Sequence, residues 1–160
     1  MNNARSAKIV LFRLGTDYFA VDIFSVERVL RYQTPTALPS TPEWIEGVIE
    51  YQGQVLPVVS LRRRFQMPAV DATPETRILI LKSESDWVGI AVDAVLEVTG
   101  FDQAQLSPPP ALFRGLAGEY LRGVVRQPDR LLIYLDVARL LSSEERLTLA
   151  QATEEALPNG

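Results

Sequence analysis

Short apolar runs of strand length alternate with turn-forming residues along most of the chain. The runs are rich in β-branched and aromatic residues, and Gly, Pro, Asp and Ser separate them at short intervals. This spacing favours a barrel or sandwich of short strands over a doubly wound α/β fold. The runs are Ile9–Phe12, Tyr18–Ile23, Leu56–Val59, Ile78–Leu81, Val88–Val92 and Leu131–Leu135.

Helical signals are few and mostly short. Single helical turns are expected at Ser60–Phe65 and Asp136–Leu141. A longer helix is expected over roughly residues 143–156, because Ser142 and Glu145 match a capping box at its start. The pattern therefore predicts a mainly β protein with a short C-terminal helix.

The sequence contains an internal repeat. Residues 9–29 align without a gap on residues 78–98, and residues 45–65 align on residues 121–141 in the same order. Two ordered blocks indicate duplication of one unit, which predicts a pair of related small β-barrels. The pairs Ile9 and Ile78, Tyr18 and Trp87, Val26 and Val95, Val29 and Val98, Gly47 and Gly123, and Leu56 and Leu132 are matched in this way.

We interpret residues 1–160 as one domain with two lobes. The first lobe covers roughly residues 9–66 and the second roughly residues 76–141, and exchange of strands between the lobes remains open. Trp87 and Leu132 each occupy a repeat-matched apolar position, so both side chains are expected to be substantially buried.

The composition limits the classes of protein to which this sequence can belong. Hydrophobic residues make up 47% of the 160 residues and charged residues 22%, which is typical of a folded globular domain. The segment Met1–Lys8 is polar, and no apolar run reaches the roughly 18 residues that span a membrane, so a cytoplasmic protein without membrane insertion is expected. A net charge of −4 argues against nucleic acid as a partner.

Candidate chemistry is sparse. The chain has no cysteine and no histidine, which excludes disulfides, thiolate nucleophiles, imidazole acid–base catalysis and zinc sites with these ligands. Asp22, Asp93 and Asp136 are scattered, and no phosphate-binding glycine loop or nucleophile elbow is present. No enzyme activity, cofactor or metal is therefore expected.

Residues 42–65 resemble the signature of the CheW family of chemotaxis coupling proteins. The motif has Pro42 before an aromatic residue and Ile45, then Gly47-Val48, a Gly53 turn, an apolar strand with Pro57, and Leu61-Arg62 with a closing Phe65. Tyr120–Val124 and Leu132–Asp136 resemble the motif of the family's second half. The resemblance runs from about Ile9 to Glu145, and the start at Met1 with a tail after Glu145 favours a free-standing protein over a kinase fragment.

The resemblance implies two five-stranded SH3-like barrels and a non-enzymatic adaptor without cofactors. Such adaptors bridge the cytoplasmic tip of a chemoreceptor and the regulatory domain of a CheA-type histidine kinase, in receptor arrays at the inner face of the membrane. The receptor tip docks as a helix between the lobes, and the kinase domain docks barrel to barrel. By resemblance, the receptor contact includes Val26, Gly47, Val48 and Gln52.

Two of these motif positions depart from the family pattern. Gln52 stands where the family has arginine, and Ser60 stands where it has aspartate. The alternative function is therefore a CheW-like scaffold in another two-component pathway, such as surface motility or surface sensing, with an altered receptor contact.

Structural roles compete with functional ones at several positions. Gly47 has two explanations, a close backbone approach or a floor for the partner helix. Val26 has core packing as its alternative role, and core packing is the expected role for most of the related valines, Val29, Val95 and Val98. The run Arg62-Arg63-Arg64 is expected to fan around a helical turn and not to form an anion patch.

Overall fold

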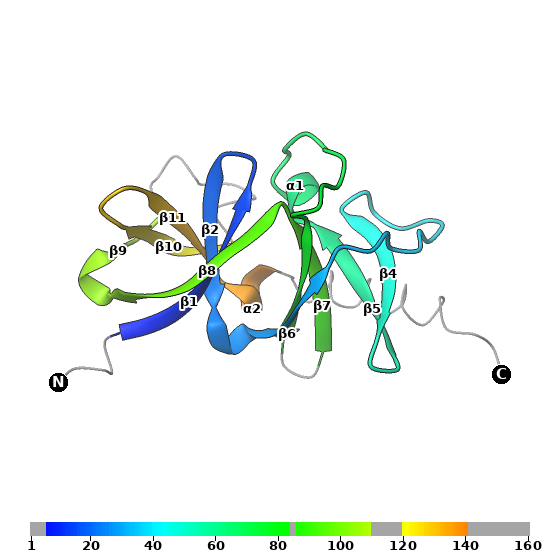
Figure 1. The fold of residues 1–160 in the computed structure, drawn as a ribbon, viewed down its shortest axis with the longest axis horizontal. Helices are drawn as coiled ribbons and strands as arrows, with labels where there is room; N and C mark the ends of the chain where they lie inside the picture. Colours follow the sequence, from blue (N-terminus) through cyan, green and yellow to red (C-terminus); the bar gives the residue numbers. More distant parts are fainter. Residues whose placement is uncertain (1–5, 84–85, 110–119, 141–160) are drawn as a thin grey trace.

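The computed structural model describes residues 6–83, 86–109 and 120–140, and these residues are mainly β-structure (Figure 1). The helices are α1 (Leu61–Arg64) and α2 (Val137–Leu140), and short 3-10 turns lie at Ile23–Ser25 and Gln103–Gln105. The strands are β1 (Ser6–Leu14), β2 (Asp17–Asp22), β3 (Val26–Arg31), β4 (Ile45–Tyr51), β5 (Gln54–Ser60), β6 (Arg77–Ser83), β7 (Asp86–Val92), β8 (Ala94–Asp102), β9 (Leu106–Ser107), β10 (Leu121–Arg126) and β11 (Leu131–Leu135).

The strands form two sheets, which lie side by side as two lobes in Figure 1. One sheet has the order β8-β1-β2-β11-β10-β9, and the other has the order β3-β6-β7-β5-β4. Neighbouring strands are antiparallel except for β2 with β11 and β5 with β7, which are parallel. The mainly β, two-lobed fold predicted from the sequence is confirmed.

Each sheet combines strands from both copies of the sequence repeat. Strands β1 and β2 of the first copy pair with β8 and β11 of the second, while β6 and β7 of the second copy pair with β3 and β5 of the first. Strand exchange, which the sequence left open, therefore occurs. The ranges 9–66 and 76–141 describe the two copies along the sequence, whereas each physical lobe draws on both. The helix expected over residues 143–156 lies outside the described residues.

The two sheets repeat each other in register as well as in strand order. Val10 pairs with Val98 in one sheet, and the matched Leu79 pairs with Val29 in the other. The strands β3 and β8 also carry a bulge at the same repeat position. This agreement follows from the duplication, because a repeated alternation of apolar residues specifies a repeated register.

The chain that follows the edge strand β3 returns to the opposite edge of the same sheet. Thr36 and Val48 exchange two backbone hydrogen bonds of 2.9 Å each. The matched segment, β9, pairs with β10 through Ser107 and Val124. In both lobes, the segment that follows the edge strand β3 or β8 thus pairs with β4 or β10 on the far side of the sheet.

Side chains that alternate along the strands fill three apolar clusters. In β1, Ile9 and Leu11 point into the interior of their own lobe, while Val10 and Phe12 point into a central cluster between the lobes. Burial on both faces explains why β1 reads as a continuous apolar run and not as an alternating one. Leu132 is fully buried, and Trp87 is partly buried and packs against the apolar cluster of its lobe, in agreement with the prediction.

Candidate partner-binding surfaces

The four residues assigned to the receptor contact by resemblance all lie in the lobe that contains β3 and β4. Val26 begins β3 and is half-buried against the central cluster. Gly47 and Val48 lie in β4 and are buried. Gln52 is exposed at the tip of the β4–β5 hairpin. Only two of the four therefore expose side-chain surface to a partner.

Gly47 is required by a close approach of two backbones. A Cβ atom at this position would lie 2.2 Å from the carbonyl oxygen of Thr36. The matched Gly123 stands in the same relation to Ser107, whose carbonyl oxygen would lie 2.4 Å from an added Cβ. Both glycines thus permit a close backbone pairing, of β4 with the segment at Thr36 and of β10 with β9. The sequence had left open whether Gly47 serves structure or binding, and this contact gives it a sufficient structural reason.

The apolar layer between the lobes reaches the surface along β3 and β8. Side chains of directly paired residues lie on the same face of a sheet. Val98 therefore lies beside Val10, and Val29 beside Leu79, on the faces that form the central cluster. Val10 is 4% exposed and Leu79 is fully buried, but Val29 and Val98 are 40% and 54% exposed.

We name the four repeat-matched valines of β3 and β8 the interlobe margin. Its inner residues, Val26 and Val95, are half-buried and pack against the central cluster. Its outer residues, Val29 and Val98, are exposed. Sequence reasoning identified Val26 but gave Val29 and Val98 a core role, because periodicity alone does not show which paired strand lies at a sheet edge.

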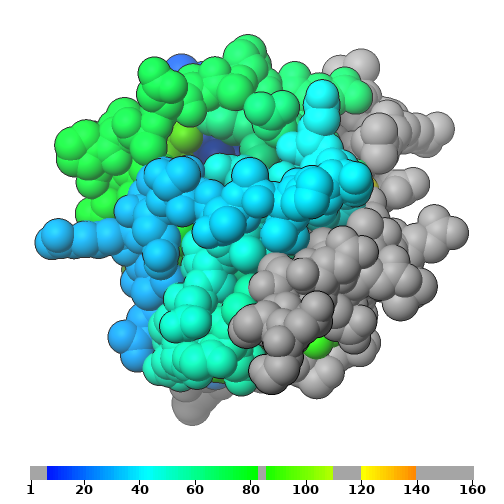
Figure 2. Space-filling model, turned by 90° about the vertical axis from the view of Figure 1, so that its right-hand side faces the viewer, coloured from blue at the N-terminus to red at the C-terminus, as the bar shows by residue number. Residues whose placement is uncertain are grey.

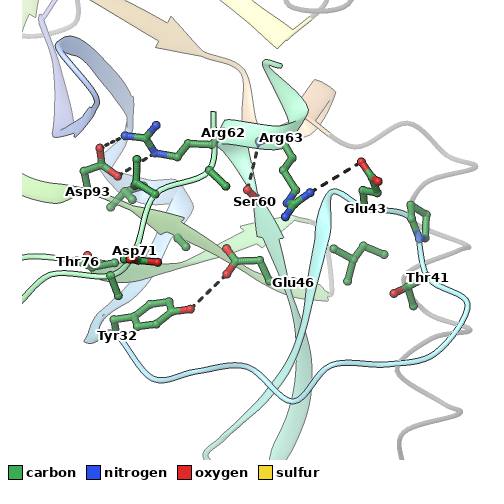
Figure 3. Close-up of a pocket in the computed structure, with 17 residues that line it drawn as sticks. Tyr32, Thr41, Glu43, Glu46, Ser60, Arg62, Arg63, Asp71, Thr76 and Asp93 are labelled. Atoms are coloured by element: carbon green, nitrogen blue, oxygen red, sulfur yellow. Dashed lines mark hydrogen bonds and ion pairs between the residues drawn. The ribbon is translucent and has the colours of Figure 1, made fainter. Parts of the chain in front are cut away.

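A cavity of about 490 Å³ opens on the lobe that contains β4, beside the loop between α1 and β6 (Figures 2 and 3). In Figure 2 the hollow lies between the green loop after α1 and the blue-to-cyan segment that leads to β4. Glu46 and Tyr32 project into it, and the Tyr32 hydroxyl donates a hydrogen bond of 3.3 Å to Glu46 Oε1.

The electrostatics of this cavity are set by burial and by nearby charge. Burial raises the pKa of Glu46, and the hydrogen bond from Tyr32 and the positive charge of Arg63 only partly offset that effect. Burial also raises the pKa of Tyr32, and the carboxylate of Glu46 raises it further. The two groups thus satisfy each other, and no nucleophile paired with a base is found among the described lining residues.

Arg62 and Asp93 form a partly buried ion pair that ties α1 to the start of β8. Two guanidinium nitrogens of Arg62 donate to the Asp93 carboxylate, and the backbone N–H of Gly15 donates to the same carboxylate at 2.7 Å. Burial alone would raise the pKa of Asp93, but the hydrogen bonds from Arg62 and Gly15 and the charge of Arg62 hold it below its ordinary value. Asp93 is therefore a structural anion and not a catalytic acid.

The three consecutive arginines of α1 point in different directions, as the sequence predicted. Arg62 reaches Asp93, and Arg63 lies 3.8 Å from the exposed carboxylate of Glu43. The Arg64 guanidinium lies 4.9 Å from the ring centroids of both Trp44 and Tyr120. The arginines therefore stabilise contacts within the protein, and no common anion patch results.

Within the described ranges, no three carboxylate, histidine or cysteine side chains gather in a way that holds a metal ion. No helix in that part of the chain is long and apolar enough to cross a membrane. Asp22 and Asp136 accept hydrogen bonds from the backbone N–H groups of Phe24 and Ala138. The fold and the surfaces together define a protein of two related β-lobes with an apolar margin exposed on both of them.

Comparison with known proteins identifies the family. The sequence profile of the CheW-like domain matches residues 8–145. The chain is 31% identical to the chemotaxis protein CheW of Treponema pallidum, with 92% of this chain and 89% of that protein covered. It is 34% identical to CheW of Klebsiella aerogenes, with 86% and 83% covered. The crystal structure of the scaffolding protein TtCheW from Thermoanaerobacter tengcongensis superimposes with a TM-score of 0.79 at 31% identity, covering 87% of this chain and 94% of that one.

The chain belongs to the CheW family. It is a non-enzymatic scaffold protein of chemotaxis signalling, as the sequence predicted.

Proposed function

We propose that this protein couples the cytoplasmic tip of a chemoreceptor to the regulatory domain of a CheA-type histidine kinase. The observation that carries the proposal is the interlobe margin, where the central apolar layer becomes exposed at Val29 and Val98 on repeat-matched strands. An amphipathic helix binds such a surface with apolar side chains at helical spacing. The receptor tip supplies that helix, and through the receptor the protein is held at the inner face of the membrane, within receptor arrays.

Val98→Asp tests the receptor contact. Val98 is 54% exposed, so aspartate there leaves the folded protein intact but places an unpaired charge against an apolar partner. We expect receptor-tip affinity to fall by about 5- to 150-fold, since burial of an unpaired polar group costs about 1–3 kcal/mol. Calorimetry with a soluble receptor-tip fragment measures the change.

Val70→Asp is the matched control. Val70 is 58% exposed in the loop between α1 and β6, where it lines the cavity beside Glu46 and is not part of the central cluster. Val70→Asp therefore introduces the same charge at a similarly exposed valine. Receptor affinity should be unchanged in this variant. Equal losses in both variants, or none in either, would contradict the assignment of the receptor to the interlobe margin.

The kinase contact should be separate from the receptor contact. Val98→Asp is therefore expected to leave affinity for the kinase regulatory domain within about twofold, because distant and independent sites have additive energies. Loss of kinase binding in a folded Val98→Asp variant would show that the two partners share one surface.

Val26 stays a predicted receptor contact, but it is a poorer test position. Its side chain packs against the central cluster, so Val26→Asp would also destabilise the fold. Gly47 and Val48 are buried, and any influence on the receptor passes through the shape of β4.

Gln52 favours the alternative of a CheW-like scaffold in a pathway other than chemotaxis. It lies exposed at a hairpin tip, where a contact with a partner is sterically open. Glutamine lacks the charge of the family's arginine, so a receptor that relies on that charge binds less tightly.

A further inference from the structure

Two arginines face each other across β3 and β6, just beyond the exposed end of the interlobe margin. Arg31 and Arg77 are direct partners in the antiparallel register of β3 and β6. Val29 and Leu79 are also direct partners, two residues away from the arginines on each strand. Because side chains alternate between the faces of a sheet, the arginine pair lies on the same face as Val29 and Leu79. The pair therefore extends the apolar surface with positive charge.

This pair is unfavourable in the protein alone. Like charges directly opposite each other destabilise a β-sheet. Arg77 donates hydrogen bonds to the carbonyl oxygens of Pro74 and Thr76 at 2.8 and 2.9 Å, and Arg31 is exposed. Throughout residues 6–83, 86–109 and 120–140, neither guanidinium has a carboxylate partner. Among the described residues, the two neighbouring cations thus lack an ion-pair partner, although the net charge of the chain is −4.

The second copy of the repeat shows that the pair is a feature of one lobe only. The matched positions in the other lobe are Lys8 and Gly100, which pair with each other across β1 and β8. Gly100 has no side chain, so only one cation stands there. The lobes thus share their valines but differ in charge at the adjacent position.

Acidic side chains near the pair do not cancel it. Glu27 occupies the bulge of β3 and is half-buried, and Glu75 is exposed in the loop before β6. Neither forms an ion pair with Arg31 or Arg77 in the described part of the chain. No carboxylate in the described part of the chain therefore neutralises the pair.

We propose that Arg31 and Arg77 bind a carboxylate that flanks the apolar stripe of the partner helix, and that this contact fixes the direction of the helix. The inference rests on the proposed function, because it concerns the same surface. A carboxylate between two guanidiniums accepts charge-assisted hydrogen bonds and removes their mutual repulsion. Since both lobes offer the same valines, an uncharged helix meets similar apolar contacts in either direction, and the charge selects one.

Two synthetic amphipathic helices of equal length provide the probes. Both have apolar residues at positions i, i+3, i+4 and i+7, and they differ only in a glutamate or a glutamine beside the stripe. Calorimetry measures each against the unchanged protein, Arg31→Gln and Lys8→Gln. We expect the glutamate helix to bind the unchanged protein about tenfold more tightly than the glutamine helix does, because a charge-assisted hydrogen bond stabilises the complex by about that factor. Arg31→Gln should abolish the difference, whereas Lys8→Gln, at the position matched to Arg77, should preserve it.

A stability measurement separates a binding role from a structural one. Removal of one of two facing cations should raise the urea midpoint of the free Arg31→Gln protein or leave it unchanged. A lowered midpoint together with equal losses for both helices would show that Arg31 is structural and overturn the inference.

Val98→Asp separates failure of this inference from failure of the proposed function. If the two helices bind equally and Val98→Asp abolishes the binding of both, the interlobe margin is still the helix-binding surface. The proposed contact between the arginine pair and a carboxylate is then rejected. If neither helix binds the unchanged protein, the proposal that the interlobe margin binds a helix is contradicted. The proposed arginine contact, which depends on it, is then contradicted as well.

Discussion

Gly47 illustrates how a single motif residue acquires its role. Its φ of 148° and the nearby carbonyl of Thr36 leave no room for a side chain, and Gly123 repeats the arrangement in the second copy. The same backbone contact requires glycine in both copies of the repeat, so the duplicated fold explains Gly47. The motif therefore marks a structural requirement at Gly47 and an exposed surface at Gln52.

Gly47→Ala should destabilise the protein by roughly 2 kcal/mol or more, because a Cβ atom 2.2 Å from the Thr36 carbonyl forces the backbone to shift. Urea unfolding measures the change. Gly53→Ala is the matched control, since Gly53 also has a positive φ, of 77°, but has nothing within 4 Å of an added Cβ. The control should lose only about 1 kcal/mol from backbone strain. Unchanged stability of Gly47→Ala with lost receptor binding would instead support a role as a floor for the partner helix.

Asp93→Asn should remove the acid sensitivity that the Arg62 ion pair introduces. The pKa of Asp93 is lowered in the folded protein, so its stabilising effect is full above the unfolded-state pKa of about 4 and is lost as the pH falls through the lower folded value. At neutral pH the variant should lose about 1–3 kcal/mol of unfolding free energy. As the pH falls below the unfolded-state pKa and through the lower folded pKa of Asp93, the difference from the unchanged protein should shrink.

Urea unfolding at several pH values checks this expectation. A stability difference that stays constant between neutral and acidic pH would show that Asp93 acts through packing and not through its charge.

Ser60 shows that a departure from the family motif can keep its local function. Its hydroxyl oxygen accepts a hydrogen bond of 3.2 Å from the backbone N–H of Arg63 and caps α1. The matched Asp136 precedes α2 and accepts from Ala138. Serine and aspartate are both good helix caps, so the exchange is mild at this position. Since Ser60 is 8% exposed, its effect on a receptor is indirect.

At the scale of elements, the β4–β5 hairpin has a two-residue connection. Tyr51 pairs with Gln54, and the intervening Gln52 and Gly53 have φ values of 49° and 77°. Positive φ at both positions is typical of a type I′ turn, whose twist matches that of the strands. The turn fixes Gln52 at the tip and directs its side chain away from the lobe core.

Gln52→Arg should preserve the fold and raise affinity for a receptor tip of the common type several-fold. Arginine adds a charged fork of donors where glutamine offers a neutral amide, a difference of about 1 kcal/mol. The residue is exposed, so stability should change by less than about 0.5 kcal/mol. Calorimetry against a common receptor tip measures the gain.

The unchanged protein is the necessary comparison. If it already binds that tip as tightly as an arginine-bearing relative does, Gln52 is a neutral variation and the specialised pathway loses its support.

At the scale of the whole molecule, strand exchange makes the two lobes interdependent. Each sheet is completed by strands from the other copy of the repeat, and the central cluster lies between them. A copy on its own would leave the edges and faces of its strands without partners. The duplicated unit therefore does not constitute an independent folding domain.

Fragments 1–72 and 73–160 should each fail to fold alone but should associate when mixed. The division falls in the exposed loop between α1 and β6, so it breaks no strand. Circular dichroism and urea unfolding of each fragment and of the mixture provide the test. Cooperative unfolding of either fragment alone would show that the exchanged strands are dispensable.

Much of the fold was predictable because the relevant signals are local. Alternation and composition identified most strands, while the ungapped repeat identified their duplication. Leu132 is buried as its apolar neighbourhood predicted. Trp87 is partly buried, as predicted, and its ring packs against that of Tyr51 at 5.3 Å between centroids. The candidate site was less predictable, since exposure depends on which strand is an edge.

The sequence by itself determined the strand pattern, the duplication and membership of the CheW family, because each is encoded by residues close together or repeated at fixed spacing. Only the tertiary structure decided that the copies exchange strands, that Val29 and Val98 reach the surface, and that Arg31 faces Arg77. These features depend on pairing between segments far apart in the chain. Such pairing is set by the burial of many side chains together, and no local pattern specifies it.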